Sequence, residues 1–109
     1  MTEFNKYKVC ISSLFNCASA CSNFVAIAVK NNNNSEYYKC IQLAMECSVL
    51  CYSTAELLSL DSSRVKKIAK ICAKLCDDCA AELTKFPEDY FQETAELCIH
   101  SADNCELII

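Results

Sequence analysis

Residues 10–21 of the chain read CISSLFNCASAC, and residues 40–51 read CIQLAMECSVLC. Both stretches have cysteine at their first, eighth and twelfth positions, so a spacing of seven and then four residues occurs twice. Each residue of an α-helix advances about 100° around the axis, and steps of three, four or seven residues therefore stay on one face. The two stretches predict two helices, each with a stripe of thiols along one side.

The other five of the eleven cysteines continue this pattern. Cys72, Cys76 and Cys79 are four and three residues apart, and Cys98 and Cys105 are seven apart. The 109-residue chain has no glycine and a single proline, Pro87. Because hairpins and tight turns normally need glycine, this composition predicts a chain that is almost entirely helical.

Turn and capping residues divide the chain into four predicted helices. An asparagine run at 31–34 ends the first, Asn34 or Ser35 caps the second, a residue within 61–63 caps the third, and Pro87 suits the first turn of the fourth. Short connections make neighbouring helices antiparallel. The predicted fold is all-α, a single up-down-up-down four-helix bundle over residues 1–109, with helices at about 2–30, 35–59, 62–85 and 88–107.

Helical angles place every cysteine on the side of its helix that faces the bundle core. Along the axis of the bundle, Cys40 and Cys79 are expected nearest one end, and Cys10 and Cys105 nearest the other. Ordinary apolar residues are expected to close the two ends. These are Phe24, Leu83, Phe86 and Phe91 at the first end, and Tyr7, Leu58, Val65 and Ile109 at the second.

Charge and compartment signals narrow the class of function. A net charge of −4 and a pI near 4.9 argue against nucleic-acid binding, which needs clustered basic residues. We find no secretory signal and no stretch approaching the roughly 20 apolar residues of a membrane span. The expected location is the cytoplasm, without membrane attachment. Thiols stay reduced there, which favours metal binding over disulfides.

The spacing of the cysteines bears on the metal. Thiolate is a soft ligand that selects Cu(I), Zn²⁺ and iron–sulfur clusters. Structural zinc and iron–sulfur sites usually draw on close cysteine pairs held by loops, whereas the single Cys-x2-Cys pair here, Cys76 and Cys79, lies inside a helix. Multiple Cu(I) ions shared between thiolates of facing helices fit better, and a zinc-binding bundle is the alternative.

These motifs resemble a known family. Cys-x6-Cys-x3-Cys in the first two helices, Cys-x3-Cys-x2-Cys in the third and Cys-x6-Cys in the fourth are similar to those of the bacterial copper storage proteins, cytosolic type. The resemblance covers essentially the whole chain. It implies storage of many Cu(I) ions, a tetrameric assembly and a ligand set of all eleven cysteines: Cys10, Cys17, Cys21, Cys40, Cys47, Cys51, Cys72, Cys76, Cys79, Cys98 and Cys105. The chain departs from the cytosolic members compared with it in having fewer cysteines, a difference that implies a lower copper capacity or a different metal in vivo.

Two other soft or titratable side chains lie off the stripes. His100 is about 160° to 200° from the thiols of its helix and Met45 about 140°, so both are expected at the surface. Glu96 and His100 do not form the Glu-x-x-His motif of di-iron bundles. An enzyme would need an exposed thiolate beside a base, and we therefore expect no enzymatic activity.

A rival class is a disulfide-stabilised, chaperone-like helical protein, because Cys-x3-Cys occurs three times. That reading leaves one of eleven thiols unpaired. Separately, apolar residues on the outer faces of the first two helices predict a homo-oligomer formed through those helices, or else wider packing within one bundle. These residues are Ile11, Phe15, Ile41, Met45, Val49 and Tyr52.

Overall fold

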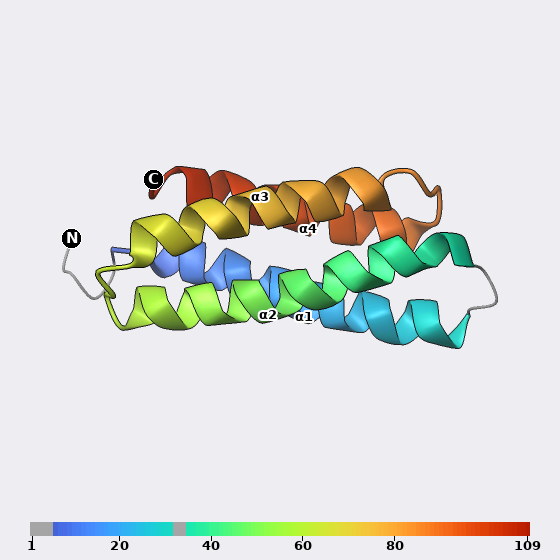
Figure 1. Ribbon diagram of the computed structural model, residues 1–109, viewed down its shortest axis with the longest axis horizontal. Helices are drawn as coiled ribbons and strands as arrows, with labels where there is room; N and C mark the ends of the chain where they lie inside the picture. The colour runs from blue at the N-terminus through green and yellow to red at the C-terminus, as the bar shows by residue number, and fades with distance from the viewer. Residues whose placement is uncertain (1–5, 32–34) are drawn as a thin grey trace.

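The computed structural model describes residues 6–31 and 35–109, and the elements in them are helical. They are α1 (Lys8–Lys30), a short 3₁₀ helix η2 (Ser35–Tyr37), α2 (Tyr38–Ser59), α3 (Val65–Leu83) and α4 (Asp89–Glu106). The four α-helices run antiparallel along a molecule that measures 48 × 19 × 19 Å (Figure 1). The predicted all-α, up-down-up-down four-helix bundle is confirmed.

Each helix packs against two neighbours around a common core. The adjacent pairs are α1 with α2, α2 with α3, α3 with α4, and α4 with α1. The start of α1, the α2–α3 turn and the C-terminus lie at one end of the bundle, and the α3–α4 turn lies at the other (Figure 1). All four helices can therefore contribute side chains to a single central column.

The helix starts differ from those predicted. The third and fourth helices begin at Val65 and Asp89, and the second begins after the 3₁₀ turn rather than at Ser35. No side chain makes a capping hydrogen bond at the start of any described α-helix, so the predicted caps at Ser35 and within residues 61–63 are wrong, while Asn34 lies outside the described part of the chain. Ser62 instead accepts a hydrogen bond from the backbone N–H of Arg64, before α3 begins. The residues predicted at 2–5 and 32–34 lie outside the described part of the chain.

The α2–α3 turn is closed by backbone hydrogen bonds. Asp61 N–H donates to the carbonyl of Leu58 and Ser62 N–H donates to that of Leu57, at 3.1 and 3.0 Å. This is the Schellman arrangement, which requires a left-handed residue just past the helix. Asp61 supplies it with φ of 52°. In a chain without glycine, aspartate is one of the residues that tolerate this conformation best.

The core is built from small residues and thiols. All eleven cysteines are buried, and ten of them have no exposed surface. Alanines lie beside them on every helix, including Ala44, Ala69, Ala95 and Ala102, each no more than 1% exposed. Small neighbours allow the helices to bring sulfur atoms together at the bundle axis. The predicted placement of cysteines where bundles normally use leucine is confirmed.

The two ends of the bundle differ. At the α3–α4 turn, Phe91 is fully buried, and its ring contacts those of Phe24, Phe86 and Tyr37 at centroid distances of 4.8 to 5.0 Å. This end is closed by aromatic packing, as predicted. At the opposite end Leu58 and Val65 are buried, but Ile109 is 45% exposed and Ile108 packs against the core in its place. The prediction for Ile109 is therefore wrong, because in the turn beyond α4 it is Ile108 that faces the core.

The apolar residues on the outer faces of α1 and α2 are partly packed within the bundle and partly exposed. Ile11, Phe15 and Ile41 are partly buried against the core. Tyr52, although its ring meets Phe15 edge-on at 5.3 Å, is more than half exposed, as are Val49 and Met45 on the same helix. An apolar strip on α2 therefore remains uncovered in the single chain.

By length and composition, α1 could cross a membrane, which differs from the expectation of no such stretch. Its serines and asparagines interrupt any purely apolar run, but its overall content of apolar and thiol residues is high. In the bundle, α1 turns Cys10, Cys17 and Cys21 inward against the other helices. A core helix passes the same test of length and composition.

Candidate metal centre

Seven thiols from all four helices form a connected chain in the middle of the bundle. Their Sγ–Sγ separations are 3.5 to 3.9 Å, with Cys51–Cys76 the shortest and Cys17–Cys47 the longest. All eleven cysteines are free thiols, and these separations are much longer than the roughly 2.05 Å of a disulfide. The seven are Cys17, Cys21, Cys47, Cys51, Cys72, Cys76 and Cys98.

Among these seven thiols, two groups of four could each surround a metal ion. In both groups the four sulfur atoms lie within 4.8 Å of one another, and every member is buried. Both groups contain Cys17 and Cys47. The first adds Cys21 and Cys98, and the second adds Cys51 and Cys76.

The chain of thiols extends toward both ends of the bundle. Hydrogen bonding with Cys21, then with Cys47 and Cys98, lowers the pKa of Cys79 below its ordinary value. In the other direction, interaction with Cys105 lowers the pKa of Cys72, and interaction with Cys10 raises the pKa of Cys105. We call these ten cysteines, all except Cys40, the thiol column.

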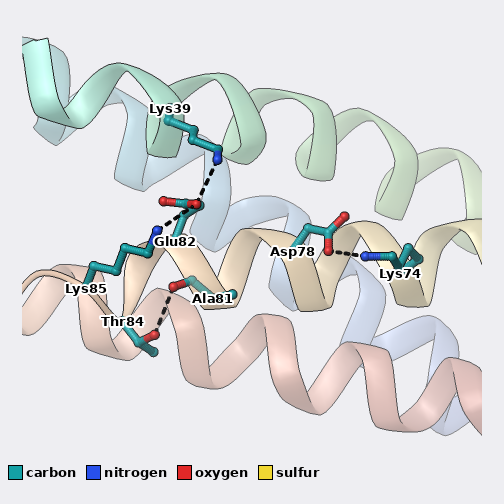
Figure 2. Close-up of polar contacts among 7 residues, drawn as sticks. All are labelled: Lys39, Lys74, Asp78, Ala81, Glu82, Thr84 and Lys85. Atoms are coloured by element: carbon teal, nitrogen blue, oxygen red, sulfur yellow. Dashed lines mark hydrogen bonds and ion pairs between the residues drawn. The ribbon is translucent and has the colours of Figure 1, made fainter.

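Cys40 stands apart from the column. Its sulfur has no thiol within hydrogen-bonding range in the described part of the chain, and burial raises its pKa to about 11. The negative charge of Glu82 acts in the same direction. Figure 2 shows Glu82 between Lys39 and Lys85, with ion pairs of 2.9 and 3.0 Å. A charged surface cluster therefore lies close to this thiol.

The thiols of the column ionise unequally because they hydrogen-bond to one another. Contacts with neighbouring thiols, Cys21 foremost, lower the pKa of Cys17, whereas contacts with Cys17 foremost raise the pKa of Cys47. A first thiolate is stabilised by the S–H groups around it, and those groups then hold their protons more tightly. A metal ion that fills the column must displace these protons as it binds.

The predicted ligand residues are thus all buried in the bundle, and seven of them are connected by Sγ–Sγ contacts of 3.5 to 3.9 Å. His100 is exposed on α4, with its Nε2 atom 3.3 Å from the side-chain amide nitrogen of Asn104. Met45 is 52% exposed on the outer face of α2. Both side chains lie outside the column.

Sequence analysis missed the buried hydroxyls, above all Ser101. This residue has no exposed surface, and its Oγ lies 3.8 Å from Cys76 Sγ and 4.0 Å from Cys51 Sγ. Its position was readable from the sequence, because it falls three residues after Cys98 and four before Cys105 on the same stripe.

One further feature is a cavity at the N-terminal end of α1. It has a volume of about 620 Å³, and its lining includes Tyr7, Cys10, Lys66, Asn104 and Ile108. Cys10 is the one cysteine with measurable exposure, 6%. The column therefore approaches the surface here, whereas aromatic rings close the opposite end.

Fold and thiols together define a class, the four-helix bundles whose core is a metal-binding column of cysteines. The chain belongs to the copper storage protein (Csp) family, whose model matches residues 3–109.

Similar proteins agree with that assignment. The uncharacterized cysteine-rich protein YhjQ of Bacillus subtilis (strain 168) is 28% identical over 98 residues, which cover 90% of this chain and 91% of the relative. The Cu(I)-bound copper storage protein BsCsp3 has a TM-score of 0.89 at 27% identity, over 94% of this chain and 97% of that one. Apo-Csp3, copper storage protein 3 from Bacillus subtilis, gives 0.87 at 27% identity, over 93% and 96%.

Proposed function

We propose that this protein stores several Cu(I) ions, bound by cysteine thiolates inside the bundle. The observation that carries the proposal is the connected set of seven thiols, in which neighbouring sulfur atoms are 3.5 to 3.9 Å apart and two possible four-thiol sites share Cys17 and Cys47. Cu(I) binds two or three thiolates, and a thiolate can bridge two ions. All eleven cysteines, including the separate Cys40, are proposed as ligands.

The sharing of thiols favours Cu(I) over zinc. The two four-thiol groups share Cys17 and Cys47, so two ions that filled them would lie close together in a dry core. Charges brought together there repel strongly because little water screens them. Two Zn²⁺ ions would repel about four times as strongly as two monovalent ions at the same distance. Zinc also favours separate, closed tetrahedral sites.

The burial of the thiols supports storage rather than catalysis. None of the eleven is more than 6% exposed, whereas a catalytic cysteine must reach a substrate beside a base or cation. The family assignment and the Cu(I)-bound structure of a similar protein support the same role. We propose that the protein is not an enzyme and that it buffers copper in the cytoplasm.

We further propose that copper reaches the column at the end where Cys10 lies. The cavity there borders Cys10, and Cys105 interacts with both Cys10 and Cys72. Successive thiols would then pass ions inward by exchange between neighbouring sulfur atoms.

Anaerobic titration with Cu(I) against a chromogenic competitor tests the proposal. We expect the competitor to stay copper-free until several ions per chain have bound, with protons released as they bind. Uptake of no more than one or two ions would contradict storage. A parallel titration with Zn²⁺ tests the alternative, and preferential filling with zinc in a mixture of both metals would support it.

A further inference from the structure

The four-thiol group formed by Cys17, Cys47, Cys51 and Cys76 takes sulfur atoms from α1, α2 and α3 but none from α4. The other group has an α4 member, Cys98. The next residue of α4 to face the column is Ser101, which is fully buried and lies within 4.0 Å of both Cys51 and Cys76. A hydroxyl thus occupies the place where α4 could have supplied a thiol.

Ser101 also differs from the other buried hydroxyls, because no backbone carbonyl partner is described for its hydroxyl in residues 6–31 and 35–109. Ser13, Thr54 and Thr94 donate to carbonyls of their own helices, those of Cys10, Leu50 and Tyr90, at 2.6 to 2.9 Å, and Thr54 also hydrogen-bonds to the Cys72 thiol. A carbonyl is the usual partner for a hydroxyl within a helix. The hydrogen bonds described for Ser101 are all to sulfur: Cys76 donates to its oxygen, and either partner can donate in its contact with Cys51.

We propose that Ser101 is a positioning residue of the thiol column, which hydrogen-bonds to the Cys51 and Cys76 thiolates when copper is bound and limits the number of ions held beside it. The inference rests on the proposed Cu(I) storage. Because a hydroxyl keeps its proton and is a hard donor, Ser101 does not replace a thiolate as a Cu(I) ligand. Its proton is instead free to point at a sulfur that carries negative charge, where a hydrogen bond is strongest.

Two substitutions test the two parts of this role separately: the limit on the number of ions and the hydrogen bonds to the thiolates. Ser101→Cys offers an additional thiol next to Cys51 and Cys76, and we expect it to bind at least one more Cu(I) per chain. Ser101→Ala removes the hydroxyl but no thiol. We expect an unchanged copper count, about tenfold weaker binding of the ions next to Cys51 and Cys76, and a thiolate-to-copper absorption band at lower energy, because the sulfur electrons lose the stabilising proton.

Ser13→Ala is the matched control, since it makes the same change at a buried serine whose hydroxyl donates to a carbonyl. The experiment is anaerobic Cu(I) loading of wild type and the three variants, with native mass spectrometry, competitor titration and ultraviolet spectra. Circular dichroism verifies that each variant is folded. A gain of copper in Ser101→Cys cannot arise from a purely structural role.

The outcomes distinguish failure of the proposal for Ser101 from failure of the proposed Cu(I) storage. If wild type loads several ions while folded Ser101→Cys gains none and Ser101→Ala matches wild type in affinity and spectrum, the inference is wrong and storage stands. An effect of Ser13→Ala equal to that of Ser101→Ala would also overturn it. A wild-type protein that takes up no copper would overturn both.

Discussion

At the scale of single residues, cysteine packs the core and is also the proposed metal ligand. A thiol is a small, largely apolar group, so a stripe of cysteines can fill the centre of a bundle without metal. The alanines beside the thiols keep the helices close enough for sulfur atoms to meet. The sulfur atoms of the proposed ligands are therefore already close together in the bundle itself.

Cys40 gives a prediction about pH. Its pKa is about 11 in the folded protein against an ordinary value of 9.0, so the folded state holds this proton more tightly than the unfolded state. The associated stability is fully present below pH 9 and is lost as the pH rises through about 11. We expect the free energy of unfolding of the copper-free, reduced protein to fall over this interval, and to fall less in Cys40→Ala.

Denaturant unfolding at several pH values measures that difference. The comparison uses the slope against pH, because the substitution itself lowers stability at every pH. Equal slopes for wild type and Cys40→Ala would show that the pKa of Cys40 is not raised.

Phe91 gives a prediction about packing. Its ring is fully buried and meets four other aromatic rings within 5.0 Å at the closed end of the bundle. Phe91→Ala should lower the free energy of unfolding by about 3 to 5 kcal/mol, measured by chemical denaturation without copper. A loss of no more than about 0.5 kcal/mol, the usual range for a surface substitution, would contradict the described packing.

At the scale of secondary structure, the helices follow from the repeat, but their ends do not. The seven-plus-four spacing of Cys10, Cys17 and Cys21 predicts both the helix and its buried face, since only one face can hold all three. Capping residues in the sequence predict where the helices start. In the structure, no side chain makes a capping hydrogen bond at the start of α2 or α3. Backbone geometry decides the α2–α3 turn instead, and no local sequence rule identified Asp61 as its left-handed residue.

That turn provides a test at the same scale. Asp61 has φ of 52°, a region where glycine is unstrained and a residue with Cβ costs roughly 1 kcal/mol or more. We expect Asp61→Gly to be more stable than Asp61→Ala by about 1 kcal/mol in denaturant unfolding. Equal stability of the two variants would show that the turn does not depend on a left-handed residue.

At the scale of the whole molecule, the candidate site belongs to no single helix. The sequence assigns each cysteine to an inward face, but the contacts between Cys17 and Cys98, or between Cys51 and Cys76, depend on how far the helices slide along one another. The same dependence explains why the separation of Cys40, and the distances from Ser101 to two sulfur atoms, could not be predicted from the sequence, although the stripe itself includes Ser101.

The exposed strip on α2 supports an oligomer, which we propose forms through α1 and α2. Met45, Val49 and Tyr52 are 52 to 68% exposed, and burial of such residues against a second copy would be favourable. Light scattering at micromolar concentration should give a mass above that of one chain, and Val49→Glu should lower it. A monomeric wild type would rule out this interface.

The central claim, that the thiols act as one shared column for copper, is tested most directly by counting ions in matched variants. Cys47 belongs to both four-thiol groups, whereas Cys40 stands apart. Native mass spectrometry after anaerobic Cu(I) loading compares wild type with Cys47→Ser and Cys40→Ser, each verified as folded. We predict several ions per chain in wild type and a larger loss in Cys47→Ser than in Cys40→Ser. No more than two ions in wild type, or equal losses in the two variants, would contradict the shared column.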